Sequence, residues 1–254
     1  HSFARCMPVQ SPHLLRTVTA PVPLPVFATS SRKMSALSMV AMPKDAKPEV
    51  VQQEYDDFAA TYDKEIAPDS TYPALRSCID TFLEILGGSD KNIKIIDLGA
   101  GTGYAAVELK KHGFTNIDGL DLSPEMLQKA KEKDAYRKYI CEAVTEKRLD
   151  IPTGTYDVVL SVGAVTSGYI KSNAFDEILR LAKPGGYIIF TIRKDVMEEE
   201  EYGFSTKFQQ FIECGKWQEV KKFLSDYVTG FHKDDTKEDL SKCYIIGYRV
   251  LQNE

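Results

Sequence analysis

The sequence has few cysteines and arranges none of them in a known functional pattern. They are odd in number, widely spaced and never form a CxxC pair, at Cys6, Cys78, Cys141, Cys214 and Cys243. This spacing argues against a disulfide framework and a zinc site, and it favours reduced thiols in an intracellular protein. The sequence also has no EF-hand pattern and no internal repeat, so we expect no metal.

Long apolar runs and an excess of positive charge are also missing. No uninterrupted apolar stretch approaches the ~20 residues that a membrane span needs. The formal net charge is −5 and the pI is about 5.5, whereas a nucleic-acid partner favours a basic face that neutralises phosphates. We therefore expect no membrane span and disfavour nucleic acid as a partner. The chain is 43% hydrophobic and 27% charged, which is typical of a globular protein.

Acidic residues are absent from residues 1–44, which hold five basic residues and the stretch "PVPLP". The net charge divides into +5 for this leader and −10 for residues 45–254. Because its prolines interrupt any helix and it has little to bury, we expect the leader to be disordered. Its composition suits a mitochondrial presequence, although the prolines oppose an amphipathic helix. The alternative is untranslated sequence read as protein, with the start at Met34, Met39 or Met42 and a cytoplasmic location.

Apolar residues in residues 50–254 show first helical spacing and then short continuous runs. The spacing of Leu75, Ile79 and Phe82 predicts a helix. Runs that predict strands follow it, at 93–98, 117–120, 139–141, 158–162 and 187–192. Strands that alternate with helices are typical of βαβ units, whose right-handed crossovers place helices on both faces of a mostly parallel sheet. We therefore predict one doubly wound α/β domain.

A glycine-rich turn follows the first of these strands, in "IKIIDLGAGTGYAAVELKKHGF" at residues 93–114. Backbone amides in a turn that has few side chains, followed by a helix N-terminus, favour a negatively charged group of a ligand. Turns of this kind hold either a dinucleotide or S-adenosylmethionine.

The spacing of the glycines distinguishes these two ligands. A dinucleotide fingerprint is GxGxxG, but its third glycine, counted from Gly99, falls on Tyr104. The pattern present is D-x-G-x-G-x-G, in which Asp97 stands two residues before the first glycine. An acid in that place suits the ammonium of S-adenosylmethionine, whereas a pyrophosphate gains nothing from it. We therefore predict S-adenosylmethionine, and not NAD, as the ligand.

A second acid, Asp121, ends the next predicted strand in "IDGLDLSPEML". A carboxylate at a strand tip can accept hydrogen bonds from both ribose hydroxyls. Ser123 then predicts the cap of a new helix, with Pro124 at its first position. Taken alone, Asp121 is equally well explained as an ordinary turn acid, and it would serve NAD too. Only its combination with Asp97 and the alternating glycines separates the two ligands.

Four motifs together resemble those of the class I S-adenosylmethionine-dependent methyltransferase superfamily: "IDLGAGTG", "GLDLSPEMLQKA", "TYDVVLSVGAV" and "LAKPGGYIIF". A narrower resemblance, to the subfamily around the methyltransferase-like protein of the Williams–Beuren syndrome region, rests on "EYDDFAATYDKE", "VVLSVGAVTSGYI" and "KPGGYIIFTIR". The resemblance covers about residues 50–250. It implies a Rossmann-like, mostly parallel sheet of seven strands with a C-terminal antiparallel hairpin, whose last strand lies near residues 244–250.

The resemblance also implies which residues bind the cofactor or its product, S-adenosylhomocysteine. Those expected around the methionine part are Asp97, Gly99, Ala100, Gly101 and Gly103. Asp121 would hold the ribose, and Leu122 would lie against the adenine. Glu142 and Ala143 stand where the superfamily has an Asp-Ala pair at the adenine amine, so the glutamate is a departure from the pattern.

Three further residues are implied at the cofactor cleft. Val162, at the tip of the fourth strand, would line it. Tyr55 and Tyr62 match aromatic positions of an N-terminal helix that closes over the cofactor. The alternative for both tyrosines is core packing of that helix.

Methyl transfer from a sulfonium is an in-line displacement, in which the protein mainly aligns nucleophile, methyl group and sulfur. A general base is needed only when the nucleophile is protonated at the working pH. No residue identifies itself as that base, since a lone histidine such as His232 is more often structural. The four glutamates at 198–201 are either a solvated helix start or an attraction for a cationic acceptor. Trp217 either packs in the core or stacks on a substrate.

We therefore predict a methyltransferase that acts on a small-molecule acceptor. Two alternatives stay open: a protein or RNA methyltransferase, and a catalytically silent module that binds the cofactor. The acidic body and the lack of an appended RNA-binding module count against RNA. The acceptor itself is not readable, because acceptor residues lie on loops that a fold does not specify.

Overall fold

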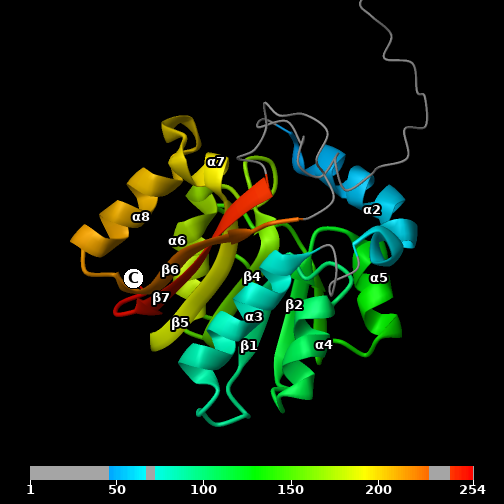
Figure 1. Ribbon diagram of the computed structural model, residues 1–254, viewed down its shortest axis with the longest axis horizontal. Helices are drawn as coiled ribbons and strands as arrows, with labels where there is room; N and C mark the ends of the chain where they lie inside the picture. Colours follow the sequence, from blue (N-terminus) through cyan, green and yellow to red (C-terminus); the bar gives the residue numbers. More distant parts are fainter. Residues whose placement is uncertain (1–45, 67–71, 229–240, 254) are drawn as a thin grey trace, which may run out of the picture. The chain divides into compact units, whose positions relative to one another are not determined.

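The structure, a computed structural model, describes residues 46–66, 72–228 and 241–253. The predicted leader at 1–44 and His232 lie outside these residues. The described part contains a seven-stranded sheet with helices packed on both faces (Figure 1). This arrangement confirms the predicted α/β fold class.

The strands of the sheet lie in the order β3-β2-β1-β4-β5-β7-β6. Their bounds are β1 Ile95–Leu98, β2 Ile117–Asp121, β3 Lys138–Cys141, β4 Tyr156–Val165, β5 Ala182–Arg193, β6 Trp217–Asp226 and β7 Lys242–Val250. Neighbouring strands from β3 to β5 are parallel, and β7 is antiparallel to both β5 and β6. The strand order reverses between β1 and β4, and such a switch point leaves a crevice at the carboxyl ends of these strands.

The edge strand β6 is the one that the sequence did not reveal. Trp217 is its only buried residue, and the other side chains are half-buried or exposed, so β6 lacks the apolar run by which the other strands were found. Strands β4 and β5 also extend beyond the predicted runs at 158–162 and 187–192.

The helices fill the connections between strands. Their bounds are α2 Pro48–Glu65, α3 Pro73–Leu86, α4 Tyr104–Lys111, α5 Pro124–Glu132, α6 Phe175–Leu181, α7 Lys194–Glu198 and α8 Phe204–Glu213, with short 3-10 turns at Ser172–Ala174 and Glu200–Tyr202. Because neighbouring strand residues point to opposite faces, Ile95 packs into the core beneath α3 and α4, and Ile96 into the core beneath α6 and α8 (Figure 1).

The helices on either side of β2 have well-defined ends, and the cap predicted at Ser123 is confirmed. Helix α4 is followed by Gly113 in a left-handed conformation, with φ of 89°. Helix α5 has Pro124 at its first position, and the Ser123 Oγ accepts a hydrogen bond from the Met126 N at 3.0 Å. Ser123 and Pro124 therefore end the turn that follows β2, whereas Gly113 follows the helix that begins after the glycine turn.

Trp217 is a core residue. Its ring stacks on that of Tyr248, with centroids 3.9 Å apart and planes 3° from parallel, and its Nε1 donates to the Phe208 carbonyl oxygen at 3.2 Å. The packing interpretation of this tryptophan is therefore confirmed, and stacking on a substrate is excluded.

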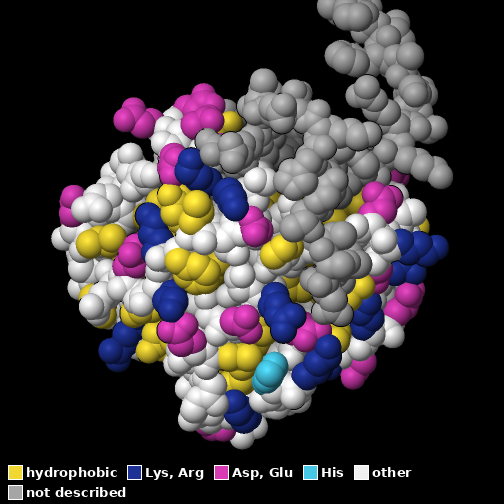
Figure 2. All heavy atoms as spheres, in the orientation of Figure 1, with side chains coloured by type: hydrophobic (Ala, Val, Ile, Leu, Met, Phe, Trp, Pro, Cys, Tyr) yellow, Lys and Arg dark blue, Asp and Glu magenta, His cyan; other side chains and the backbone are white. Residues whose placement is uncertain are grey.

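The surface of the described residues agrees with the composition. Figure 2 shows acidic side chains gathered near α7, where the glutamates at 198–201 are exposed, and intermingled charges elsewhere on that face. Within the described ranges no helix is long and apolar enough to cross a bilayer, and no cluster of metal-ligating side chains occurs. The cysteines that the structure describes are free thiols, at Cys78, Cys141, Cys214 and Cys243.

Candidate cofactor-binding site

The glycine turn after β1 leaves open space at its centre. Gly99, with φ of 74°, has no room for a side chain, because an added Cβ would lie 2.2 Å from the Ala164 Cβ. Gly101, with φ of 52°, differs, since no atom lies within 4 Å of the place of its Cβ. Close packing therefore explains Gly99, whereas Gly101 keeps free the surface that a ligand would occupy.

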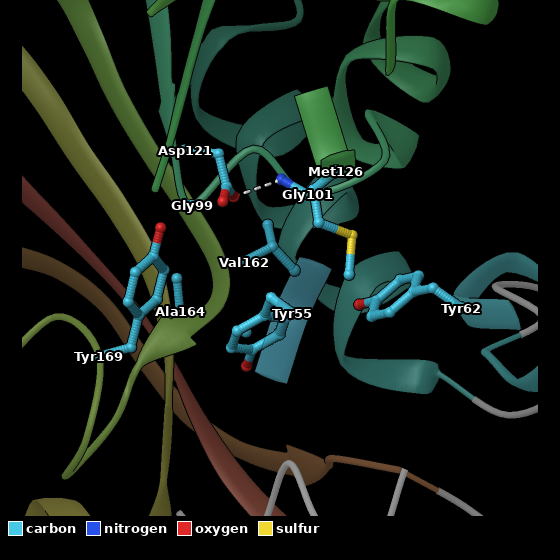
Figure 3. Close-up of a pocket in the computed structure, with 10 residues that line it drawn as sticks. Tyr55, Tyr62, Gly99, Gly101, Asp121, Met126, Val162, Ala164 and Tyr169 are labelled. Atoms are coloured by element: carbon cyan, nitrogen blue, oxygen red, sulfur yellow. Dashed lines mark hydrogen bonds between the residues drawn. The ribbon is translucent and has the colours of Figure 1, made fainter. Parts of the chain in front are cut away.

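Two adjoining cavities lie at the carboxyl ends of β1 and β4, each with about 360 Å³ of open space. We call them the Asp121 cavity (Figure 3) and the Asp97 cavity. The lining of the Asp121 cavity is Tyr55, Tyr62, Gly99, Gly101, Asp121, Met126, Val162, Gly163, Ala164 and Tyr169. The lining of the Asp97 cavity is Tyr62, Tyr72, Leu75, Asp97, Gly99, Ala100, Gly101, Thr102, Tyr104, Ala105 and Val162. The residues that line both are Tyr62, Gly99, Gly101 and Val162.

Asp121 is a buried carboxylate held by backbone amides. Its Oδ2 accepts a hydrogen bond from the Gly101 N at 2.8 Å, and its Oδ1 accepts one from the Ser123 N at 2.9 Å. Figure 3 shows the Tyr169 hydroxyl pointing toward the same carboxylate. Burial raises the pKa of Asp121 to about 6, although these hydrogen bonds oppose the shift.

The buried carboxylate of Asp97 has fewer hydrogen-bond partners than that of Asp121. Its Oδ2 accepts a hydrogen bond from the Tyr136 hydroxyl at 2.6 Å, but its buried Oδ1 has no partner among the described residues. The hydroxyl of Thr102 in the same cavity is also buried without a partner there. Burial raises the pKa of Asp97 to about 7; the Tyr136 hydrogen bond lowers this pKa and the charge of Asp121 raises it further.

Helix α2 covers the Asp121 cavity. Its Tyr55 ring lies 5.9 Å from that of Tyr169, centroid to centroid, and Figure 3 shows Tyr62 and the side chain of Met126 pointing toward one another. Polar contacts hold the helix in place: Asp56 accepts from the Ser123 hydroxyl, and Asp63 forms an ion pair with Lys133, with an N–O distance of 2.5 Å.

The donor set fits S-adenosylmethionine. Within the described residues neither Asp97 nor Asp121 forms an ion pair with a lysine or arginine, and a buried carboxylate without a cation is costly. S-adenosylmethionine brings an ammonium and a sulfonium to such a site. The pyrophosphate of NAD would instead add negative charge beside two carboxylates, so the electrostatics favour the first ligand.

Comparison with known proteins agrees with this site. The family model described as "Methyltransferase domain" matches residues 96–190. Human Methyltransferase-like protein 27 is 32% identical over 165 residues, which cover 65% of this chain and 66% of that protein. The chain belongs to the class I S-adenosylmethionine-dependent methyltransferase superfamily.

Two further comparisons extend the likeness of this methyltransferase domain. The rice (Oryza sativa subsp. japonica) 2-methyl-6-phytyl-1,4-hydroquinone methyltransferase 2 is 28% identical over 133 residues, 52% of this chain and 37% of that protein. The solved structure of magnesium protoporphyrin IX methyltransferase from Synechocystis PCC 6803, with bound S-adenosylmethionine, shares the fold with a TM-score of 0.58 at 13% identity. It covers 80% of this chain and 96% of the solved one. The chain spans about two thirds or less of its curated relatives' length.

The structure brings together most of the residues that the sequence singled out. Those that line a cavity are Tyr55, Tyr62, Asp97, Gly99, Ala100, Gly101, Asp121 and Val162. Gly103 lies just outside as the residue before α4, where its missing side chain makes room for Ala135. Three adenine-side residues, Leu122, Glu142 and Ala143, do not line either cavity. Glu142 is exposed, and its N donates to the Asp121 carbonyl oxygen at 3.1 Å, so this group lies at the rim.

Several cavity residues were not found from the sequence. They are Tyr72, Leu75, Thr102, Tyr104, Ala105, Met126, Gly163, Ala164 and Tyr169, with Tyr136 behind Asp97. Tyr104 counted in the sequence only as a missing glycine. No local pattern marks the other tyrosines, because they reach the site from a helix start and from loops.

We expect Gly101→Ala to lower the affinity for S-adenosylhomocysteine at least about tenfold while the fold survives. The methyl group meets no protein atom, so the loss of stability should be that of one left-handed alanine, about 1–2 kcal/mol. The methyl group nevertheless enters the open centre of the turn. Titration calorimetry and urea unfolding of the same preparation measure the two effects.

Gly99→Ala is the matched control for this substitution. Its methyl group would collide with that of Ala164, so it should destabilise the protein more than Gly101→Ala does. Wild-type affinity in a folded Gly101→Ala protein would show that the ligand does not lie against this turn.

Proposed function

We propose that this protein transfers the methyl group of S-adenosylmethionine to a small-molecule acceptor. The observation that carries the proposal is the pair of buried carboxylates, Asp97 and Asp121, without lysine or arginine partners among the described residues, on either side of one glycine turn. The family membership supports the cofactor, and the shape of the site supports the acceptor class.

Each of the two cavities would bind a different part of the cofactor. When bound, the cofactor supplies a methyl group that its sulfonium already makes electrophilic. Asp97 would hold the ammonium through its unpartnered Oδ1, and Asp121 would accept hydrogen bonds from the ribose hydroxyls. Tyr55 and Tyr62 of α2 would exclude water from the same space. Alignment of the acceptor with the methyl group is then the main contribution of the protein.

The closure of the site supports a small acceptor. Tyr62 of α2 lines both cavities, and polar contacts from Asp56 and Asp63 fasten this helix to the two ends of α5. A base or side chain of a macromolecule would have to pass this cover, whereas a small molecule needs only a transient opening. The rice relative named above, whose name specifies a hydroquinone, is consistent with such an acceptor.

Two measurements test the proposal. Calorimetry with S-adenosylmethionine, S-adenosylhomocysteine and NAD should show binding of the first two only. Incubation of the protein and methyl-labelled cofactor with fractionated extract should then place label in the small-molecule fraction. Label in protein or RNA would support those acceptors instead. Cofactor binding without label in any fraction would support the silent module, and binding of NAD alone would refute the proposal.

We expect Asp121→Ala to lower the affinity for S-adenosylhomocysteine by about 30- to 150-fold, because it removes two charge-assisted hydrogen bonds at a partly solvated ribose. Asp121→Asn should fall between wild type and Asp121→Ala, because it keeps an acceptor and loses the charge. Titration of the three proteins measures the series. Affinities within a few-fold of each other would mean that Asp121 serves only to hold the Gly101 and Ser123 amides.

A further inference from the structure

Two phenol hydroxyls converge at Gly163, near the carboxyl end of β4. An added Cβ at Gly163, with φ of 79°, would lie 2.1 Å from the Tyr72 hydroxyl oxygen and 3.7 Å from that of Tyr227. The rings of the two tyrosines meet edge to face, with centroids 5.8 Å apart. Both side chains are buried, Tyr72 at 8% and Tyr227 at 6% exposure. The missing side chain of Gly163 therefore makes room for a hydroxyl.

The order of the hydrogen bonds determines what Tyr72 offers to a ligand. The Tyr227 hydroxyl donates to the Gly163 carbonyl oxygen at 3.5 Å, so only its lone pairs remain for the neighbouring Tyr72 hydroxyl, and the proximity of Tyr227 helps burial to raise the pKa of Tyr72. Because Tyr227 has one proton and gives it to Gly163, Tyr72 is the donor in any hydrogen bond between the two phenols. The Tyr72 oxygen then keeps lone pairs for another donor, and Tyr72 lines the Asp97 cavity.

This oxygen lies beside the place of the transferred methyl group, if the proposed function is right. Asp97 would hold the amino-acid end of the cofactor and Asp121 the ribose, and the sulfonium joins these two parts. The sulfonium would then lie where the cavities meet, against Val162, which lines both. Gly163, which the Tyr72 hydroxyl covers, is the next residue along β4.

We propose that Tyr72 positions an amine acceptor: its hydroxyl oxygen accepts a hydrogen bond from an N–H of the acceptor, whose nitrogen lone pair then faces the methyl group. An oxyanion would instead meet the lone pairs of Tyr72 close to two buried carboxylates. Arg193, whose positive charge acts on Tyr227, already forms a bidentate ion pair with Asp195. An alcohol would need a base, but burial raises the pKa of Tyr72 well above its usual value and that of Tyr227 to about 12.

The step that follows is balanced without a protein base. A neutral amine nitrogen forms the new N–C bond as the C–S bond breaks, and the electron pair of that bond stays on sulfur. The methylated ammonium then releases one N–H proton to solvent. The aromatic rings of Tyr62 and Tyr72, which line the Asp97 cavity, suit the positive charge that develops on nitrogen.

Sinefungin tests this subsite without a turnover measurement. It carries a primary amine where the cofactor carries the methyl-bearing sulfonium, so its amine should donate to the Tyr72 oxygen. Calorimetry on the full chain should show that Tyr72→Phe lowers the affinity for sinefungin about 10-fold or more, as expected for the loss of one hydrogen bond to a charged group. The same substitution should lower the affinity for S-adenosylhomocysteine less than about twofold. Tyr169→Phe, the same change at the ribose end, should weaken both ligands equally.

A second variant and a methylation assay complete the test of the Tyr72 subsite. Tyr227→Phe frees the proton of Tyr72 to point at the ligand, so it too should weaken sinefungin more than S-adenosylhomocysteine, and it replaces Tyr72→Phe if that variant does not fold. With wild type, panels of small amines and of carboxylic acids and the labelled cofactor should yield N-methyl products.

Equal effects of Tyr72→Phe on both ligands, or label in the acids alone, would refute the subsite and leave the proposed function standing. Failure of wild type to bind either ligand would refute the proposed function itself.

Discussion

Asp97→Asn is expected to make the free protein more stable at pH 8 and to lower its affinity for S-adenosylhomocysteine more than about 100-fold. The loss of affinity follows from the removal of the charge that would meet the ligand ammonium; a charge-assisted contact contributes up to about 3 kcal/mol. Calorimetry of both proteins at pH 7.5 measures it. We expect few other single substitutions in the site to lower the affinity for S-adenosylhomocysteine more than Asp97→Asn does.

The gain in stability follows from the raised pKa of Asp97, which is about 7 in the folded protein against an ordinary value of 3.8. The folded state therefore binds the proton more tightly than the unfolded chain does. The contribution of Asp97 is most favourable below pH 4 and is lost as pH rises to about 7. Above that pH the buried charge costs about 2–4 kcal/mol, which asparagine avoids. Urea unfolding at pH 5 and pH 8 should show a difference that grows with pH.

Asp118→Asn is the matched control, a buried carboxylate exchanged away from the cavities. Asp118 is held by Arg137 through both oxygens, at 2.8 and 3.0 Å from the Nη2 atom, and by the Tyr156 hydroxyl at 3.1 Å. Its replacement should destabilise the protein at pH 8 and leave ligand affinity unchanged. A destabilised Asp97→Asn protein with wild-type affinity would mean that Asp97 serves only to hold Tyr136.

The sequence was sufficient for those parts of the fold and site that depend on local chemistry. Apolar runs mark β1, β2, β4 and β5 because both faces of these parallel strands are largely buried. The short run at β3 marks a parallel edge strand whose residues are half-buried or exposed. The acids and glycines after β1 and β2 were found because consecutive residues make the turn. Strand β6 was missed for the opposite reason: its pairing with β7 is long-range, and its exposed side chains carry no apolar period.

The tyrosines of the site could not have been predicted in the same way. Tyr72 precedes α3, and Tyr227 follows β6, 64 residues after the glycine whose carbonyl it contacts. Nothing in the sequence near either residue distinguishes it from a core tyrosine. Their meeting at Gly163 depends on how α3 and the C-terminal hairpin pack against β4, so only the assembled fold brings these hydroxyls to that glycine.

The affinity for S-adenosylhomocysteine is expected to fall steeply as pH drops below 7. In the free protein the pKa of Asp97 is raised to about 7 and that of Asp121 to about 6. The ligand ammonium and ribose hydroxyls favour the ionised forms, so the complex binds fewer protons than the free protein. Affinity therefore rises with pH up to about 7 and then levels off. Between pH 7.5 and pH 5 the change should be roughly several hundred-fold, if both groups ionise fully in the complex.

Two variants show which part of this pH dependence of the affinity comes from Asp97 and which from Asp121. Asp97→Asn removes the titration near pH 7, so its weaker affinity should decline only below about pH 6, with Asp121. Asp121→Asn should keep the decline that begins near pH 7 and lose the lower one. Calorimetry across the pH range, repeated in buffers of different ionisation enthalpy, also counts the protons released on binding. An affinity that is flat from pH 5 to 7.5, with no proton release, would mean that neither carboxylate meets the ligand as an anion.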